Sequence, residues 1–297
     1  MTNPFRVTHR SVGIRTLQGL QSNLEKVTRL QEQLSSGKQI ARPSDSPTST
    51  VSAMRLRGEV RTNEQYTRNA DDGVGWLATI DAALTGSLAN VRRVRELALN
   101  GMSTGSSTPE SRQALAVEVE QLREHLVSVA NTTYLDRPVF GGTTPGSVAY
   151  DKATGAFVGD RNAVSRTVGD GVEVRVDITG PEVFGEGDTE LFTVLADIAK
   201  SLKGNPGALT ADLGRLDTAM RTMQNRLADV GTRYSRVEQA RQTASDRVIG
   251  MRGDLSSVED IDLPKTIVDL QMQEAAYQAA LGATRKVVQP SLVEFLR

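Results

Sequence analysis

An apolar seam in the second half of this chain constrains its fold more than any other feature of the sequence. Between residues 209 and 258, apolar side chains recur at alternating steps of four and three, and no proline interrupts residues 207–263. This spacing is typical of a long helix that packs one face against other helices. At about 1.5 Å per residue, the helix would be roughly 75 Å long. The seam consists of Leu209, Leu213, Leu216, Met220, Met223, Leu227, Val230, Tyr234, Val237, Arg241, Ala244, Val248, Met251, Leu255 and Val258.

Two more segments repeat this spacing and predict partner helices. Residues 110–131 carry Leu115, Val119, Leu122, Leu126 and Val129, and residues 74–100 carry Leu77, Ile80, Leu84, Leu88, Val91 and Ala98. Thr108 and Pro109 supply an N-cap and a first helical proline for the segment 110–131. These helices need one another to bury their seams, which predicts a mainly α fold: an elongated antiparallel helical bundle. Arg241, the charged member of the long seam, should reach the bundle edge or pair with a carboxylate on a neighbouring helix.

A small β domain is expected in the middle of the chain. Ten of the 26 glycines fall within residues 141–187. Val172, Val174, Val176 and Ile178 alternate with polar residues, which is the pattern of a half-buried strand. Residues 150–157 contain a glycine turn and resemble a hairpin. The predicted fold is therefore a helical bundle with a small inserted β domain.

The two ends of the chain carry further apolar stripes and predict a terminal coiled coil. Each end has one apolar stripe on an otherwise polar segment, and such a helix is marginal in water without a partner. If the ends pair, a seam remains available for other copies or related chains, as in a polymer subunit. The candidate polymer-contact residues are Leu17, Leu20, Leu24, Val27, Leu34, Ile267, Leu270, Tyr277, Leu281, Val288 and Phe295.

Five segments follow from these patterns. They are an N-terminal coiled-coil helix (1–42), the first part of a helical rod (43–140), an inserted β-rich domain (141–205), a long return helix (206–262) and a C-terminal coiled-coil helix (263–297).

Composition excludes several classes of function. The chain has no cysteine and only two histidines, His9 and His125, so no catalytic, metal-binding or cofactor-binding residue is proposed and we expect no enzyme. Thirty-five basic and 36 acidic residues leave a net charge of −1, which argues against a nucleic-acid partner. No apolar run reaches the roughly 18 residues of a membrane span. The first twenty residues lack the apolar core of a secretory signal, so no cleaved signal is expected.

Several motifs, in order, resemble the bacterial flagellin superfamily. Leu34–Ile40 (LSSGKQI) and Pro43–Pro47 (PSDSP) are similar to its N-terminal signature. Asn69–Gly73 (NADDG) and Val91–Ala98 (VRRVRELA) are similar to its next block, and Ala275–Val288 is similar to its terminal helix. These motifs cover nearly all of the chain outside residues 141–205.

Within this superfamily, three features are closer to the hook–filament junction proteins than to flagellins. They are the start Phe5–Thr8 (FRVT), the segment Lys38–Pro47, and the turn Asp151–Gly155 with the strand after it. The resemblance implies a structural subunit at the hook–filament junction of the extracellular flagellum, exported through the flagellar type III apparatus without a cleaved signal. It also implies hook-associated protein 1 and flagellin as neighbours, a cytoplasmic export chaperone, and self-association in a ring.

Two alternatives remain open at this point. A flagellin would share every terminal motif, and filament self-assembly would distinguish it. A cytoplasmic coiled-coil scaffold would need paired termini in the monomer and no export.

Overall fold

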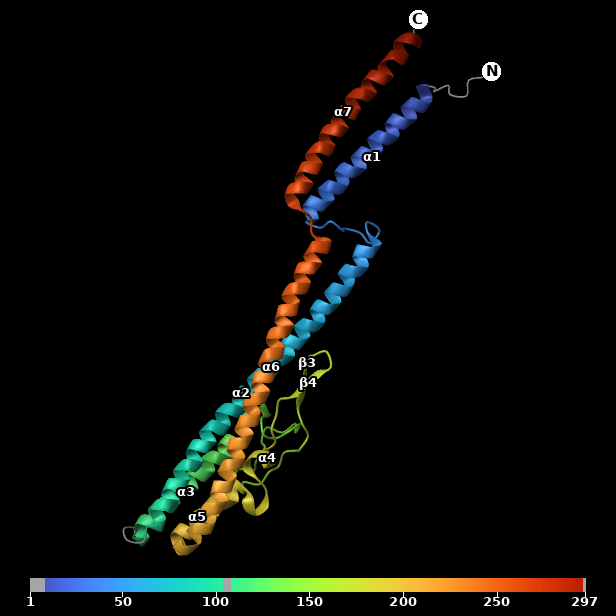
Figure 1. Ribbon diagram of the computed structural model, residues 1–297. Helices are drawn as coiled ribbons and strands as arrows, with labels where there is room; N and C mark the ends of the chain where they lie inside the picture. Colours follow the sequence, from blue (N-terminus) through green and yellow to red (C-terminus); the bar gives the residue numbers. More distant parts are fainter. Residues whose placement is uncertain (1–8, 104–107, 296–297) are drawn as a thin grey trace. The chain divides into compact units, whose positions relative to one another are not determined.

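The structure is a computed structural model that describes residues 9–103 and 108–295 (Figure 1). This description leaves out residues 1–8, which include the FRVT start. It also leaves out the side chains of residues 9–12 and 286–295. The chain divides into two compact units, residues 1–61 with 249–297 and residues 62–248. Two helices, α2 (Pro47–Met102) and α6 (Leu209–Glu259), contribute to both units.

The unit formed by residues 62–248 contains the core that the apolar seams predict. Helix α3 (Pro109–Ala130) and helix α5 (Leu191–Gly204) pack with α2 and α6 around it. From α6, Leu216, Met223 and Val237 are fully buried, while Tyr234 is 37% exposed. The members from α2 are fully or almost fully buried: Leu77, Ile80, Leu84, Leu88, Val91 and Ala98. The prediction of a mainly α helical bundle is confirmed.

Local signals place the start of α3 and the side chain of Arg241 as expected. Thr108 caps α3, since its Oγ1 accepts a hydrogen bond from the Ser111 N–H at 3.2 Å.

The Arg241 guanidinium pairs with Asp71 of α2 at 3.4 Å and with Glu238 one turn earlier in α6 at 2.5 Å. A charge on an otherwise apolar seam is therefore compensated at the edge of the helix pair.

The β structure is small and consists of two hairpins among the described residues. Strands β1 (Thr133–Tyr134) and β2 (Arg137–Pro138) pair antiparallel, as do β3 (Ser165–Gly169) and β4 (Val172–Arg175). Residues 150–157 also turn back as expected, with a bridge between Tyr150 and Phe157. The remaining short elements are helix α4 (Gly180–Phe184) and the 3-10 turns η1 (Gly187–Thr189) and η2 (Pro206–Ala208).

The range 141–205 contains more helix than its glycines suggest. Helix α5 occupies fourteen residues near its end, Leu191–Gly204, and the β1–β2 hairpin lies before its start. In α5, apolar residues such as Leu191, Leu195 and Ile198 recur at helical spacing and are fully buried. The segment is thus a mixed insertion whose helix completes the core of this unit.

Charged side chains fasten this insertion to α6. The Arg175 guanidinium contacts the buried carboxylate of Asp177 at 2.8 Å and the half-buried carboxylate of Glu182 at 2.7 Å. From α6, Arg233 donates to the Asp177 carbonyl at 2.8 Å, and Arg226 donates to the Glu182 carbonyl at 3.2 Å. These contacts fix strand β4 and helix α4 on one face of α6.

The other unit is built on two helices from opposite ends of the chain. Helix α1 (His9–Ser36) and helix α7 (Leu263–Phe295) lie side by side (Figure 1). Gly37 ends α1 with a φ of 69°, a conformation that glycine adopts without strain. Asp262 caps α7, since its Oδ1 accepts from the Lys265 N–H at 3.1 Å. The first residues of α2 and the last of α6 complete this unit.

Candidate functional site

Among the described residues, no group of three or more histidine, aspartate or glutamate side chains is placed to hold a metal ion. His125 is exposed on α3, and the side chain of His9 lies outside the description. Across the described part of the chain, no helix is both long and apolar enough to cross a membrane. The candidate contact residues lie instead on the surface and in the seam of the helix pair α1–α7.

A regular stripe on each terminal helix faces the other helix. On α1 the protected positions are Thr16, Leu20, Asn23, Val27, Leu30 and Leu34, and on α7 they are Thr266, Leu270, Gln273, Tyr277, Ala280 and Thr284. Both follow alternating steps of four and three, the spacing of two helices packed along a shared seam. Asn23 and Gln273 meet within this seam, with the Gln273 amide donating to Asn23 Oδ1 at 3.2 Å.

The candidate contact residues divide into a protected set and an exposed set. Val27 is buried, and Leu20, Leu34, Leu270 and Tyr277 are half-buried, so these five belong to the seam between α1 and α7. By contrast, Leu17 is 58% exposed, Leu24 48%, Leu281 40% and Ile267 39%. The side chains of Val288 and Phe295 lie outside the description.

Helix geometry explains this division. A residue three positions before a seam residue lies about 60° away from it around the helix, because each residue turns about 100°. Leu17 and Leu24 precede Leu20 and Val27 by three, and Ile267 precedes Leu270 by three. Each apolar band is therefore wider than one partner helix covers. We call the four residues Leu17, Leu24, Ile267 and Leu281 the exposed flank.

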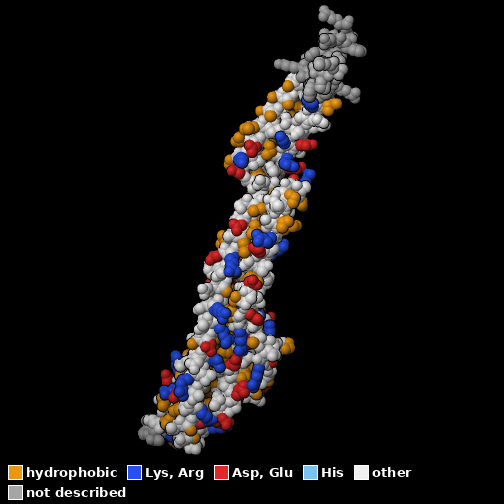
Figure 2. All heavy atoms as spheres, turned by 45° about the vertical axis from the view of Figure 1, so that its right-hand side comes forward, with side chains coloured by type: hydrophobic (Ala, Val, Ile, Leu, Met, Phe, Trp, Pro, Cys, Tyr) orange, Lys and Arg blue, Asp and Glu red, His pale blue; other side chains and the backbone are white. Residues whose placement is uncertain are grey.

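Apolar residues missed in the sequence extend the exposed surface of this unit. Val268 and Met272 of α7 are 54% and 65% exposed, and Val51 and Met54 of α2 are 68% and 65% exposed. Figure 2 shows hydrophobic side chains on the surface at the end that carries α1 and α7. Their spacing of three or four residues within helices could have revealed them. Groups of large apolar side chains left exposed in this way are typical of protein–protein contacts.

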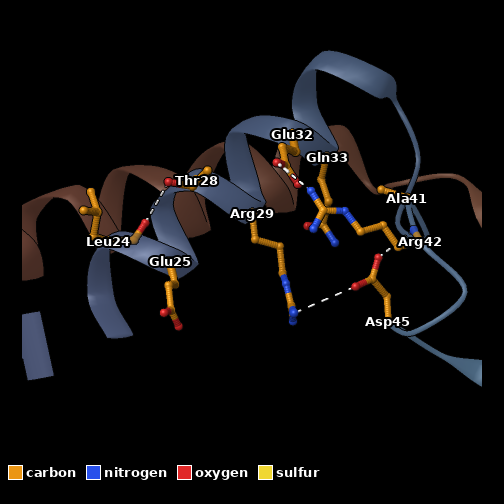
Figure 3. A pocket seen from close by; sticks show the side chains of 9 residues that line it. All are labelled: Leu24, Glu25, Thr28, Arg29, Glu32, Gln33, Ala41, Arg42 and Asp45. Carbon is orange, nitrogen blue, oxygen red and sulfur yellow. Dashed lines mark hydrogen bonds and ion pairs between the residues drawn. The ribbon is translucent and has the colours of Figure 1, made fainter. Parts of the chain in front are cut away.

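A hollow of about 460 Å³ lies between the second half of α1 and the segment 37–46 (Figure 3). Its lining includes Leu24 of the exposed flank, and the rest is mostly charged or polar. Arg42 contacts Glu32 at 3.4 Å, and Arg29 approaches Asp45 at 3.9 Å. The pairs hold the segment against α1. The hollow is lined by Leu24, Glu25, Thr28, Arg29, Glu32, Gln33, Ala41, Arg42 and Asp45.

The chain resembles flagellar proteins in sequence. Residues 7–139 match the bacterial flagellin N-terminal helical region. Flagellar hook-associated protein 3 of Escherichia coli (strain K12) is 25% identical over 295 residues, covering 89% of this chain and 93% of that protein. Flagellin of Bacillus subtilis (strain 168) is 24% identical over 291 residues, covering 93% of this chain and 94% of that protein.

Solved structures share the fold. A putative flagellar hook-associated protein from Vibrio parahaemolyticus aligns with a TM-score of 0.66 at 19% identity, over 73% of this chain and 100% of that one. Flagellar hook-associated protein-3 from Legionella pneumophila aligns with a TM-score of 0.61 at 13% identity, over 69% of this chain and 98% of that one.

Proposed function

We propose that this chain is a member of the flagellin superfamily and a structural subunit of the bacterial flagellum that forms the junction between hook and filament. The similarity to hook-associated protein 3 extends over most of both chains. The structural observation that carries the proposal is the exposed flank. Four large apolar side chains on the paired terminal helices remain open to a neighbouring subunit.

The contact works by burial of apolar surface. Burying a leucine or isoleucine side chain fully stabilises an association by about 1.5–3 kcal/mol. The seam residues Leu20, Val27, Leu34, Leu270 and Tyr277 hold the helix pair together, and the exposed flank then packs on adjacent subunits. Val288 and Phe295 belong to the same proposed contact surface. No cofactor or catalytic residue has a part in this mechanism, and we infer that the protein is not an enzyme.

The partners follow from this position in the flagellum. Hook-associated protein 1 would contact one side of the junction and flagellin the other, and copies of the chain would associate in a ring. An export chaperone would keep the apolar terminal helices from associating before export. The protein would leave the cell through the flagellar export apparatus without a cleaved signal and act in the extracellular flagellum.

Electron microscopy of a strain that lacks this gene product tests the proposal. The expected result is complete hooks without filaments, with flagellin released into the medium. Expression of the intact chain should restore filaments. Filaments of normal length and number in the deletion strain would contradict the junction role.

A filament subunit is the second candidate, since the similarity to Bacillus subtilis flagellin covers 93% of this chain. Self-assembly of the purified protein separates the two functions. A flagellin should polymerise alone into long filaments when seeded with filament fragments, whereas a junction subunit should not extend them.

A further inference from the structure

The two connections that interrupt the helices lie directly against each other. Residues 37–46 join α1 to α2, and residues 260–262 join α6 to α7. The Gln39 N–H donates to the Glu259 carbonyl at 2.6 Å, and the Ile261 N–H donates to the Gly37 carbonyl at 3.2 Å. Lys38 and Asp260 thereby form an antiparallel bridge. The chain thus pairs with itself at the level where both helices break.

Four charged side chains surround this bridge. Lys38 Nζ contacts Asp260 at 2.6 Å and Glu259 at 3.4 Å, and Arg57 contacts Glu259 at 2.8 Å. The Glu259 side chain is only 6% exposed, and these two cations compensate its buried carboxylate. We call Lys38, Arg57, Glu259 and Asp260 the ionic clasp. Its two positive and two negative charges balance.

The seam between α1 and α7 does not by itself fix how the helices align. Its protected positions repeat every seven residues, so a slip of one heptad would again face the same stripes. Within the seam, the Asn23–Gln273 hydrogen bond is a polar contact that such a slip would break. A slip of one heptad would also move Lys38 about 10 Å along the helix direction, away from Asp260.

We propose that the ionic clasp sets the register in which α1 and α7 pair. The clasp lies where α1 ends and α7 begins, beside the last seam residue of α1 and the first of α7, so it selects one alignment from those that the heptad spacing allows. The chosen register then determines which apolar side chains form the exposed flank. The proposal concerns the fold of the single chain and does not depend on the junction role.

Disulfide trapping tests the register directly, because the chain has no cysteine of its own. The native reporter is Asn23→Cys with Gln273→Cys, whose side chains are in contact. Two slipped reporters place the partner one heptad away, as Leu30→Cys or Thr16→Cys with Gln273→Cys. All three reporters replace Gln273 and therefore remove the Asn23–Gln273 hydrogen bond. Any remaining preference for one register then reflects the clasp and not that bond. Dilute full-length protein is oxidised, and the rate of intramolecular disulfide formation is measured.

With the clasp intact, the native reporter should cross-link at least about tenfold faster than either slipped reporter. Lys38→Glu places a third negative charge beside Glu259 and Asp260 and should reduce this preference at least about fivefold, since it replaces attraction by repulsion. Lys38→Arg should keep the preference, and Lys26→Glu on the exposed side of α1 is the matched control.

Two results would overturn the proposal. One is equal cross-linking of native and slipped reporters in the chain with an intact clasp. The other is a native preference that Lys38→Glu leaves unchanged. Failure of the junction role would appear separately, as filaments in the deletion strain.

Discussion

Glu182 both caps helix α4 and pairs with a neighbouring arginine. Its carboxylate accepts from the Thr179 N–H at 2.9 Å as part of a capping box at α4, and it contacts Arg175 at 2.7 Å. Partial burial alone would raise the pKa of Glu182, but the Arg175 contact and the cap outweigh it and lower the pKa to about 2. The charged form is therefore favoured by the fold.

Glu182→Gln should destabilise the protein in a pH-dependent way. The lowered pKa stabilises the fold above about pH 4.5, and this contribution disappears as the pH falls from 4.5 to about 2. Because solvent screens this half-buried group, we expect a loss of about 1–2 kcal/mol at pH 7. Urea unfolding at pH 7 and pH 3 measures it, with Glu173→Gln at an exposed position of β4 as the control. A difference that does not shrink at pH 3 would show that the charge of Glu182 is not responsible.

Arg241→Leu should leave stability unchanged or slightly improve it. The arginine is 39% exposed at the side chain and pairs with Asp71 and Glu238, which are themselves solvent-accessible. When the arginine is removed, both carboxylates remain hydrated, so neither becomes an unpaired buried charge. Leucine at this position also continues the apolar seam. The denaturation midpoint should stay at or above that of the native chain. A clearly lower midpoint would mean that the ion pairs contribute more than their exposure suggests.

At the level of elements, periodicity predicted long helices better than short ones. The seams of α3 and α6 mark both helices closely, because many turns repeat the same spacing. Helix α5 has a clear apolar face, but it follows a glycine-rich stretch that suggested strand throughout. The β1–β2 hairpin has two residues in each strand, too few for an alternating pattern to appear.

The turn of this hairpin also lacks the sequence that usually reveals it. Leu135 and Asp136 have φ of 47° and 61°, a turn in which Asn-Gly is preferred. Leucine is strained in this conformation, and its side chain here is 72% exposed.

Leu135→Asn should therefore stabilise the protein by about 1 kcal/mol, since asparagine tolerates positive φ and little apolar burial is lost. The midpoint of urea unfolding measures the gain. Leu135→Ala serves as the control and should change stability little, because alanine relieves no backbone strain. Loss of stability in the asparagine variant would indicate that the leucine side chain contributes contacts of its own.

For the whole molecule, the sequence predicted that the termini carry the contact surface, but not how that surface divides. The candidate stripe contained residues of two neighbouring helix faces. Leu20 and Leu270 lie on the face that pairs, while Leu17 and Ile267 lie beside it. A sequence pattern cannot separate faces about 60° apart until the partner helix is placed. The ionic clasp was not predicted for a different reason: it joins residues more than 200 positions apart, and no local spacing reveals such a contact.

The most direct test of the account compares one charge on the exposed flank with one in the core. Leu281→Asp should leave the melting temperature of the purified chain unchanged, because Leu281 is 40% exposed. In an assembled flagellum it should remove about 2–5 kcal/mol per contact and add the cost of a buried charge, so cells should lack filaments. Leu216→Asp, at a fully buried position of α6, should instead unfold the chain. Normal filament growth with Leu281→Asp, or a fall in melting temperature as large as that with Leu216→Asp, would contradict the account.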